Sequence, residues 1–226
     1  MTSKILFTTR TSPIAGHSSS PFSGLNLATH VDDISENVLR NRAQLESYIG
    51  LPIQFLDQVH GNQVASIEKI CEPPIADAAF TRVNGIALAV MVADCVPILF
   101  TSDEVVGVAH VGRRGLVNGV ITQVAATLRN MSPSNIAAHI GPHICPSCYE
   151  ISPDLANEIS QNFPEAISQS RWGTPSIDLR RSIIQQLQIE EIETNDLSHC
   201  TYEDENLFSY RRDKKTGRNA GIVWIE

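Results

Sequence analysis

Apolar residues recur along this chain in two different periods, which predict where its strands and helices lie. Short β-rich runs occupy residues 4–10, 53–61, 62–70, 136–142 and 220–225, and three more occupy 86–92, 96–102 and 105–111. Continuous apolar runs of this length are typical of strands buried on both faces. We therefore expect residues 86–111 to form the centre of a sheet. The runs 53–61 and 62–70 predict two strands that meet at a turn near Gly61.

Helical spacing marks four other segments. Residues 35–49 carry an apolar stripe that ends at Gly50, and residues 117–128 repeat apolar positions at i, i+3, i+4, i+7, i+8 and i+11. Ser152 and Asp178 each stand where an N-cap would begin a further helix. Strands and helices alternate without a linker, charge block or repeat. The pattern predicts one α/β (mixed α+β) domain over residues 1–226, with mixed β-sheets flanked by helices.

Composition and charge narrow the classes of function. The chain has 226 residues, of which 42% are hydrophobic, and its net charge is -8. Such a surface repels phosphate backbones, so nucleic acid is not an expected partner. No apolar run reaches the 18 residues of a membrane span, which predicts a cytoplasmic protein without a membrane partner. The Ser-, Pro- and Gly-rich loop at 11–25 is expected to be either disordered or wrapped around a site.

The chain has five cysteines, which is an odd number, and its sequence gives no sign of secretion. We therefore expect reduced thiols and no disulfide framework. Cys145 and Cys148 spell a C-x-x-C motif, which occurs in redox and zinc sites. No second C-x-x-C completes a four-cysteine site. The expectation is therefore that this pair is neither a redox centre nor a structural zinc site.

Three other polar residues, His60, Cys95 and His110, lie at the edges of predicted core strands. Cys95 and His110 are about equally far from the turn at 102–104, so antiparallel pairing would bring them close together. Two imidazoles and one thiolate suit zinc, and three protein ligands leave a fourth position open, as in catalytic sites. Spacing alone leaves a second interpretation open, in which the histidines are hydrogen-bonded rim residues and the cysteine only packs.

A set of motifs resembles a known family over nearly the whole chain. In order, they are "FTTR", "LNL", "QVHG", "ADAAFT", "ADCVPILF", "VAHVGRRG", "IGPHICPSCYEI" and "FSYRRDKKTGR". This succession is similar to that of the laccase-domain, or YfiH-type, family. That family was formerly labelled polyphenol oxidase and is associated with zinc-dependent purine nucleoside phosphorylase and adenosine deaminase activity.

The resemblance implies a metal site made of His60, Cys95 and His110, the same three residues that the strand pattern selects. These residues, together with Asp94, would also be catalytic. Asp94 would orient a ligand or carry a proton. The alternative is that Asp94 caps backbone amides at the end of a strand.

Four residues are expected to bind substrate: Arg10, Asn26, Gln58 and Arg114. Gln58 would reach the base or the ribose. Arg114 lies between a strand and a helix start, where an anion is favoured. Arg10 and the arginines of "SYRRD" are further candidates for phosphate.

Two departures from the family pattern bear on the substrate. Arg113 replaces a tryptophan, which adds a cation. In "GPHICPSC", His143 replaces a cysteine and Cys145 a glycine. The changes at 143 and 145 would either add a metal ligand or be neutral drift within a loop, and we favour drift.

The leading hypothesis is a zinc-dependent purine nucleoside phosphorylase that acts on adenosine, inosine or guanosine with phosphate. Adenosine deaminase and methylthioadenosine phosphorylase are accompanying activities, and the protein is expected to be a monomer or a weak homodimer. One alternative is a copper-dependent polyphenol oxidase, although no two of the seven histidines are two residues apart. Others are a cysteine hydrolase or amidase using Cys95 and His110, and a zinc-stabilised binding module.

Overall fold

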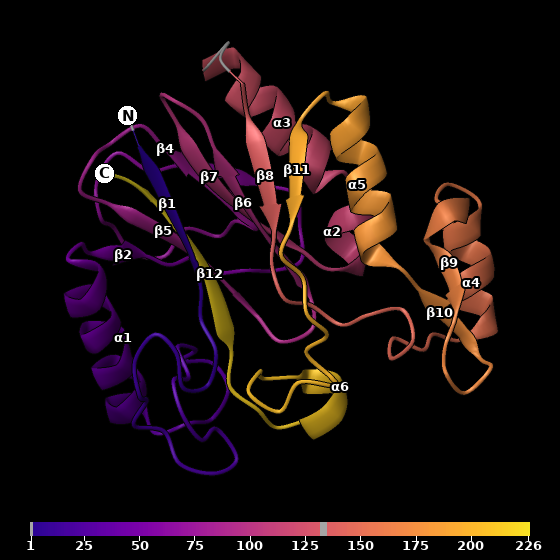
Figure 1. Ribbon diagram of the computed structural model, residues 1–226, viewed down its shortest axis with the longest axis horizontal. Helices are drawn as coiled ribbons and strands as arrows, with labels where there is room; N and C mark the ends of the chain where they lie inside the picture. The colour runs from indigo at the N-terminus through magenta and orange to yellow at the C-terminus, as the bar shows by residue number, and fades with distance from the viewer. Residues whose placement is uncertain (1, 132–134) are drawn as a thin grey trace.

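The computed structural model describes residues 2–131 and 135–226, in which most strands belong to two sheets (Figure 1). The first sheet has the order β1 (Ser3–Phe7), β12 (Asn219–Ile225), β5 (Ala87–Val92) and β2 (Ile53–Gln54). The second has the order β11 (Glu193–Asp196), β8 (Ala137–Ile140), β6 (Val96–Thr101), β7 (Val106–Val111), β4 (Ala78–Thr81) and β3 (Val64–Ser66). Both contain parallel and antiparallel pairs. A separate hairpin joins β9 (Ile167–Gln169) and β10 (Pro175–Ile177).

The helices lie mainly on the outer faces of these sheets. They are α1 (Ser35–Ile49), α2 (Arg113–Val117), α3 (Val120–Met131), α4 (Pro153–Ser160), α5 (Leu179–Ile189) and α6 (Tyr210–Asp213), with a short 3₁₀ helix at Pro164–Ala166. Figure 1 shows α1 on one side of the molecule and α3 and α5 on the other. The mixed α/β class predicted from the sequence is confirmed.

Alternating side chains explain how the layers pack. Leu88 and Val90 of β5 pack between the sheets, against Leu99 of β6, whereas Ala89 of β5 packs with the cluster that includes Leu45 of α1. The other face of β6 packs on the helices that cover the second sheet. Because both faces of β5, β6 and β7 are covered, these three strands are continuous apolar runs in the sequence.

The chain crosses from the first sheet to the second between β5 and β6, at residues 93–95. The antiparallel pairing of β6 with β7 puts Pro97 opposite His110, so the predicted closeness of Cys95 and His110 is confirmed. The site described below is therefore built where the backbone leaves one sheet and enters the other.

Two predicted elements differ from the structure. The runs 53–61 and 62–70 do not form adjacent strands, because β2 joins the first sheet and β3 the second. The predicted helix at 117–128 is interrupted at Gly119, whose φ of 77° is left-handed, and Val117 is 44% exposed at the end of α2. The caps are confirmed, since Ser152 and Asp178 accept hydrogen bonds from backbone amides three residues later.

The 11–25 loop packs against the protein through Phe22 and Leu25, both of which are buried. Ser18 and Gly24 also form a short antiparallel bridge. No helix in residues 2–131 and 135–226 is long and apolar enough to cross a membrane.

Candidate metal centre and pocket

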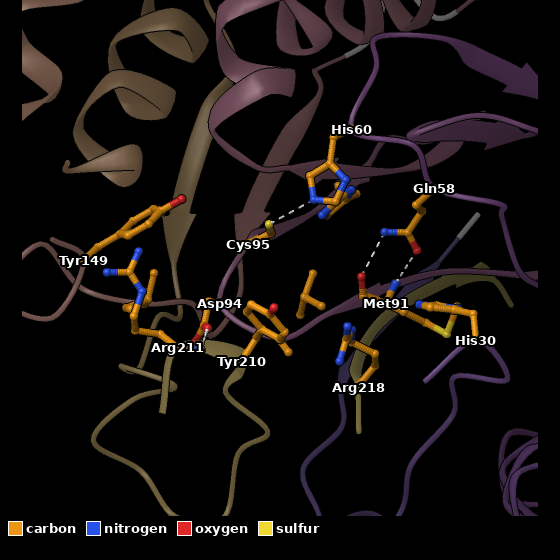
Figure 2. A pocket seen from close by; sticks show the side chains of 14 residues that line it. His30, Gln58, His60, Met91, Asp94, Cys95, Tyr149, Tyr210, Arg211 and Arg218 are labelled. Carbon is orange, nitrogen blue, oxygen red and sulfur yellow. Dashed lines mark hydrogen bonds between the residues drawn. The ribbon is translucent and has the colours of Figure 1, made fainter. Parts of the chain in front are cut away.

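A pocket of about 440 Å³ opens where β5, β6 and β7 end (Figure 2). Its volume falls within the range of small-molecule sites. Its lining residues come from both sheets and from the loops beside them. They are His30, Gln58, His60, Met91, Val92, Ala93, Asp94, Cys95, His110, Ile144, Tyr149, Tyr210, Arg211 and Arg218. No residue of the 11–25 loop is among them.

The predicted triad comes together in this pocket. His60, Cys95 and His110 each offer a ligand atom, and these atoms lie within 4.8 Å of one another. Cys95 Sγ is 3.8 Å from His60 Nε2, and the two imidazole rings are edge to face with centroids 4.7 Å apart. Two nitrogens and one sulfur form a donor set that suits a borderline-soft metal such as zinc, so the residues fit a metal ion.

Asp77, for which the sequence pattern predicted no role, fixes both histidines. Its buried carboxylate accepts hydrogen bonds from the backbone amides of Val59, His60 and Gly61, at 3.1, 2.9 and 2.6 Å. His110 Nδ1 donates to the same carboxylate at 2.7 Å, which leaves Nε2 as the atom available for the pocket. His60 adopts a left-handed φ of 61° that these bonds support. In the sequence, Asp77 is the aspartate of the motif "ADAAFT", and this motif was the signal that could have identified it.

Electrostatic coupling makes Cys95 acidic. Burial alone would raise the pKa of its thiol, but the charge of His110 and hydrogen bonds from His110 and His60 lower it to about 6. Burial opposes the charged form of His110 too, yet Cys95 and Asp77 raise the pKa of His110 to about 9. Without a metal, the pair is a thiolate beside an imidazolium at neutral pH.

A glycine allows this close packing. A Cβ at Gly112 would lie 2.9 Å from Cys95 Sγ and 3.0 Å from His60 Cδ2. These distances are shorter than normal van der Waals contacts. Only glycine therefore lets both side chains rest against the backbone after β7.

Asp94 borders the pocket, but its oxygens have structural partners. Oδ1 accepts from the hydroxyls of Thr201 and Ser209, both at 2.7 Å, and Oδ2 accepts from the Arg211 amide at 2.6 Å. Through these hydrogen bonds, Asp94 holds the segment that contains α6 in place. This geometry favours the capping interpretation over a proton carrier.

The side-chain amides of Gln58 and Asn26 also form hydrogen bonds within the protein. Gln58 lines the pocket, but its side chain pairs with the backbone N–H and C=O of Met91, at 2.8 and 2.9 Å. Asn26 is buried outside the lining and accepts from the Arg218 amide at 3.0 Å. Both residues position pocket walls, and the substrate contacts expected of their side chains stay predictions.

The predicted anion-binding arginines are placed elsewhere. Arg10 pairs with Asp213 at 2.9 Å, stacks over Phe208 and does not line the pocket. Arg114 is exposed on the five-residue α2 and is also absent from the lining. The helix break at Gly119 removes the long helix on which the expectation for Arg114 depended. Both side chains lie outside the lining of this pocket, and their role in binding substrate stays a prediction.

Arg211 and Arg218 line the pocket instead (Figure 2). Arg211 is one of the "SYRRD" arginines; it lies 4.9 Å over the Tyr149 ring and donates to the Glu150 carbonyl. Arg218 was not predicted. Burial lowers its pKa, while Cys95 and Asp94 act in the opposite direction. Burial also raises the pKa of Tyr149 to about 12, so its phenol stays protonated.

The two departures from the family pattern lie close to this wall. Arg113 lowers the pKa of Tyr149 electrostatically, although burial and Cys95 outweigh that effect. His143 is buried, its ring donates to the Gly141 carbonyl at 2.9 Å, and burial lowers its pKa. His143 belongs to neither of the metal-type clusters found among the described residues.

Two known proteins are similar to this chain over most of its length. "Purine nucleoside phosphorylase ORF3" of Streptomyces griseus is 38% identical over 93% of this chain and 91% of its own length. "Purine nucleoside phosphorylase YfiH" of Escherichia coli K12 is 34% identical over 94% of this chain and 90% of its own.

Solved structures share the fold. Protein NMB0706 of Neisseria meningitidis has a TM-score of 0.89 at 34% identity, covering 99% of this chain and 94% of that one. YlmD of Geobacillus stearothermophilus has a TM-score of 0.87 at 27% identity, covering 98% and 91%.

The family model described as multi-copper polyphenol oxidoreductase laccase matches residues 4–226. The likeness to YfiH-type proteins inferred from the motifs is therefore confirmed, and the chain belongs to this laccase-domain family.

Proposed function

We propose that the protein is a zinc-dependent purine nucleoside phosphorylase. The observation that carries the proposal is that the His60, Cys95 and His110 donor set opens into the same pocket as two arginines. Relatives named purine nucleoside phosphorylase, at 34 and 38% identity over most of both chains, support it. Its substrates would be a purine nucleoside and inorganic phosphate.

Arg211 and Arg218 would bind the phosphate. Each guanidinium has only part of its N–H groups engaged by backbone carbonyls in the described residues. Arg218 is a largely desolvated cation, so an anion beside it would relieve the cost of its burial. The two arginines give this pocket a local positive charge in a protein whose net charge is -8.

The nucleoside would lie between this wall and His60. Figure 2 shows His30 and Met91 on the side of Arg218, and Tyr149 next to Arg211 on the opposite side of the pocket. In phosphorolysis, a phosphate oxygen bonds to C1′ of the sugar while the bond from C1′ to the purine nitrogen breaks. The purine leaves with that electron pair and takes up a proton. The protonated phenol of Tyr149 is a donor available on this side of the pocket.

His60, Cys95 and His110 would hold the zinc ion, with Asp77 fixing the ring of His110. When bound, zinc supplies a Lewis acid at the reacting centre. The same pocket would support two further activities, adenosine deamination and phosphorolysis of methylthioadenosine.

The test compares zinc-reconstituted wild-type protein with Cys95→Ser protein on adenosine and inosine. We expect phosphate-dependent release of adenine or hypoxanthine from the wild type and a large loss in the variant. Ammonia release from adenosine without phosphate reports the deaminase activity separately. Wild-type turnover by Cys95→Ala protein stripped of metal would refute the proposal.

A cysteine hydrolase is a second candidate, because Asp77, His110 and Cys95 also form a carboxylate–imidazole–thiol series. Iodoacetamide separates the two candidates. A zinc-bound Cys95 thiolate is protected in metal-replete protein, whereas a nucleophilic Cys95 is labelled at once. Copper oxidase activity would require phenol turnover that persists after loosely bound metal is removed.

A further inference from the structure

Three cysteines that are far apart in the sequence meet outside the pocket. The Sγ atoms of Cys145, Cys148 and Cys200 lie within 4.8 Å of one another, and all three thiols are free. The sequence suggested that the Cys145–Cys148 pair lacks a partner. The partner was missed because it is a single cysteine on a distant loop.

Backbone hydrogen bonds hold the two loops in this arrangement. The Cys148 amide donates to the Cys145 carbonyl at 3.0 Å and closes a tight turn between them. The Cys145 amide donates to Cys200 Sγ at 3.4 Å. His143 bridges to the 199–201 segment, since its amide donates to the His199 carbonyl at 3.0 Å. The cluster is therefore fixed by backbone, not by chance contact of side chains.

Charged groups flank the cluster, although burial and the neighbouring thiols raise the pKa of Cys145 and of Cys148 in the absence of a metal. Arg171, on the β9–β10 hairpin, places Nη2 2.8 Å from Cys148 Sγ and pairs with Glu203. A guanidinium beside a thiol stabilises its anion. Glu203 Oε1 lies 3.8 Å from Cys148 Sγ, so a carboxylate is within reach of the same centre.

We propose that Cys145, Cys148 and Cys200 bind a structural zinc ion through three thiolates, with Glu203 beside the fourth position. Tetrahedral zinc with sulfur at about 2.3 Å separates its sulfurs by about 3.8 Å. The observed cluster needs to contract by at most about 1 Å to reach that geometry. This site shares no ligand with the His60 centre and is independent of the proposed activity.

The zinc would brace one wall of the pocket. Ile144 and Tyr149 flank the Cys145–Cys148 turn, and both line the pocket. The Ile144 amide donates to the Asp94 carbonyl at 3.0 Å, and Thr201, next to Cys200, donates to the Asp94 carboxylate. A metal that joins the two loops would thus fix the positions of Tyr149 and Asp94 relative to each other.

Cobalt(II) distinguishes the new site from the His60 centre. In Cys95→Ser protein the pocket centre has no thiolate, so any sulfur-to-cobalt charge-transfer band must come from the cluster. We expect about one cobalt per chain with a strong near-ultraviolet band after gel filtration. Cys200→Ser in that background loses the band, and Cys71→Ser, which changes an exposed cysteine, retains it. A Cys95→Ser protein without the band would overturn the proposal.

Alkylation of the wild-type protein gives a test that needs no variant. Mass mapping after iodoacetamide treatment should show that zinc shields the partly exposed Cys145 and Cys200, and that chelation makes these two thiols reactive. Cys71 should be labelled equally in both states. Equal labelling of Cys145 and Cys200 with and without zinc would overturn the proposal. A disulfide among the three cysteines in zinc-containing protein isolated without reductant would also overturn it and assign redox chemistry.

Discussion

Replacing Asp77 with asparagine tests how the pocket centre is held together. The carboxylate accepts four hydrogen bonds, three from backbone amides and one from His110 Nδ1. Asparagine keeps one acceptor oxygen and turns an NH₂ group toward donors. Breaking a buried pair of this kind costs about 3–5 kcal/mol of unfolding free energy. Loss of a residue that orients a metal ligand weakens metal binding by roughly 10- to 100-fold.

The same substitution has a pH signature in metal-free protein. Asp77 helps Cys95 to raise the pKa of His110 to about 9, so Asp77→Asn should lower it toward the ordinary value without reaching it. Because this pKa is raised in the folded state, the stabilisation is complete below about pH 6.5 and is lost as the pH rises past about 9. The destabilisation by Asp77→Asn should therefore shrink at high pH.

Three assays measure these effects: chelator competition for zinc affinity, urea unfolding for stability, and NMR titration for His110. The matched control is Asp57→Asn, which removes an exposed carboxylate from the preceding segment. Wild-type zinc affinity together with an unchanged His110 pKa in Asp77→Asn protein would refute the reasoning.

Further predictions concern the thiol, the cationic wall and the packing glycine. The alkylation rate of Cys95 in metal-free protein should rise with a midpoint near pH 6, and His110→Ala should move that midpoint up; an unshifted midpoint would contradict the coupling. Arg218→Gln should raise the KM for phosphate by roughly 10- to 100-fold, from the loss of a charged hydrogen bond, with little effect on the KM for nucleoside. Arg40→Gln, an exposed change on α1, should leave both constants unaltered. Gly112→Ala should lower the zinc content measured by elemental analysis, because the added methyl meets Cys95 Sγ at 2.9 Å; full occupancy would refute the packing argument.

Local pattern was sufficient for the core and for part of the site. The continuous apolar runs of β5, β6 and β7 and the short turn between β6 and β7 predicted that Cys95 and His110 lie close together. The N-cap residues Ser152 and Asp178 likewise predicted where helices α4 and α5 begin. These features depend on neighbours in the sequence or on a single hairpin.

Residues placed by long-range contacts could not be derived in this way. His60 reaches the centre because Asp77 binds its backbone, and no periodicity links an irregular loop to that carboxylate. The expectation for Arg114 assumed a continuous helix, whereas Gly119 ends the first short helix. Arg218 faces the pocket because Asn26 holds its backbone from the other end of the chain.

The most direct test of the central claim is phosphate-dependent cleavage of a purine nucleoside by the zinc-reconstituted protein, followed as release of free base. We expect equal amounts of base and pentose 1-phosphate. We also expect that chelation abolishes the activity, that zinc restores it, and that Cys95→Ser protein does not regain it. Undiminished cleavage by metal-free Cys95→Ala protein, or no cleavage by the fully zinc-loaded wild type, would contradict the account.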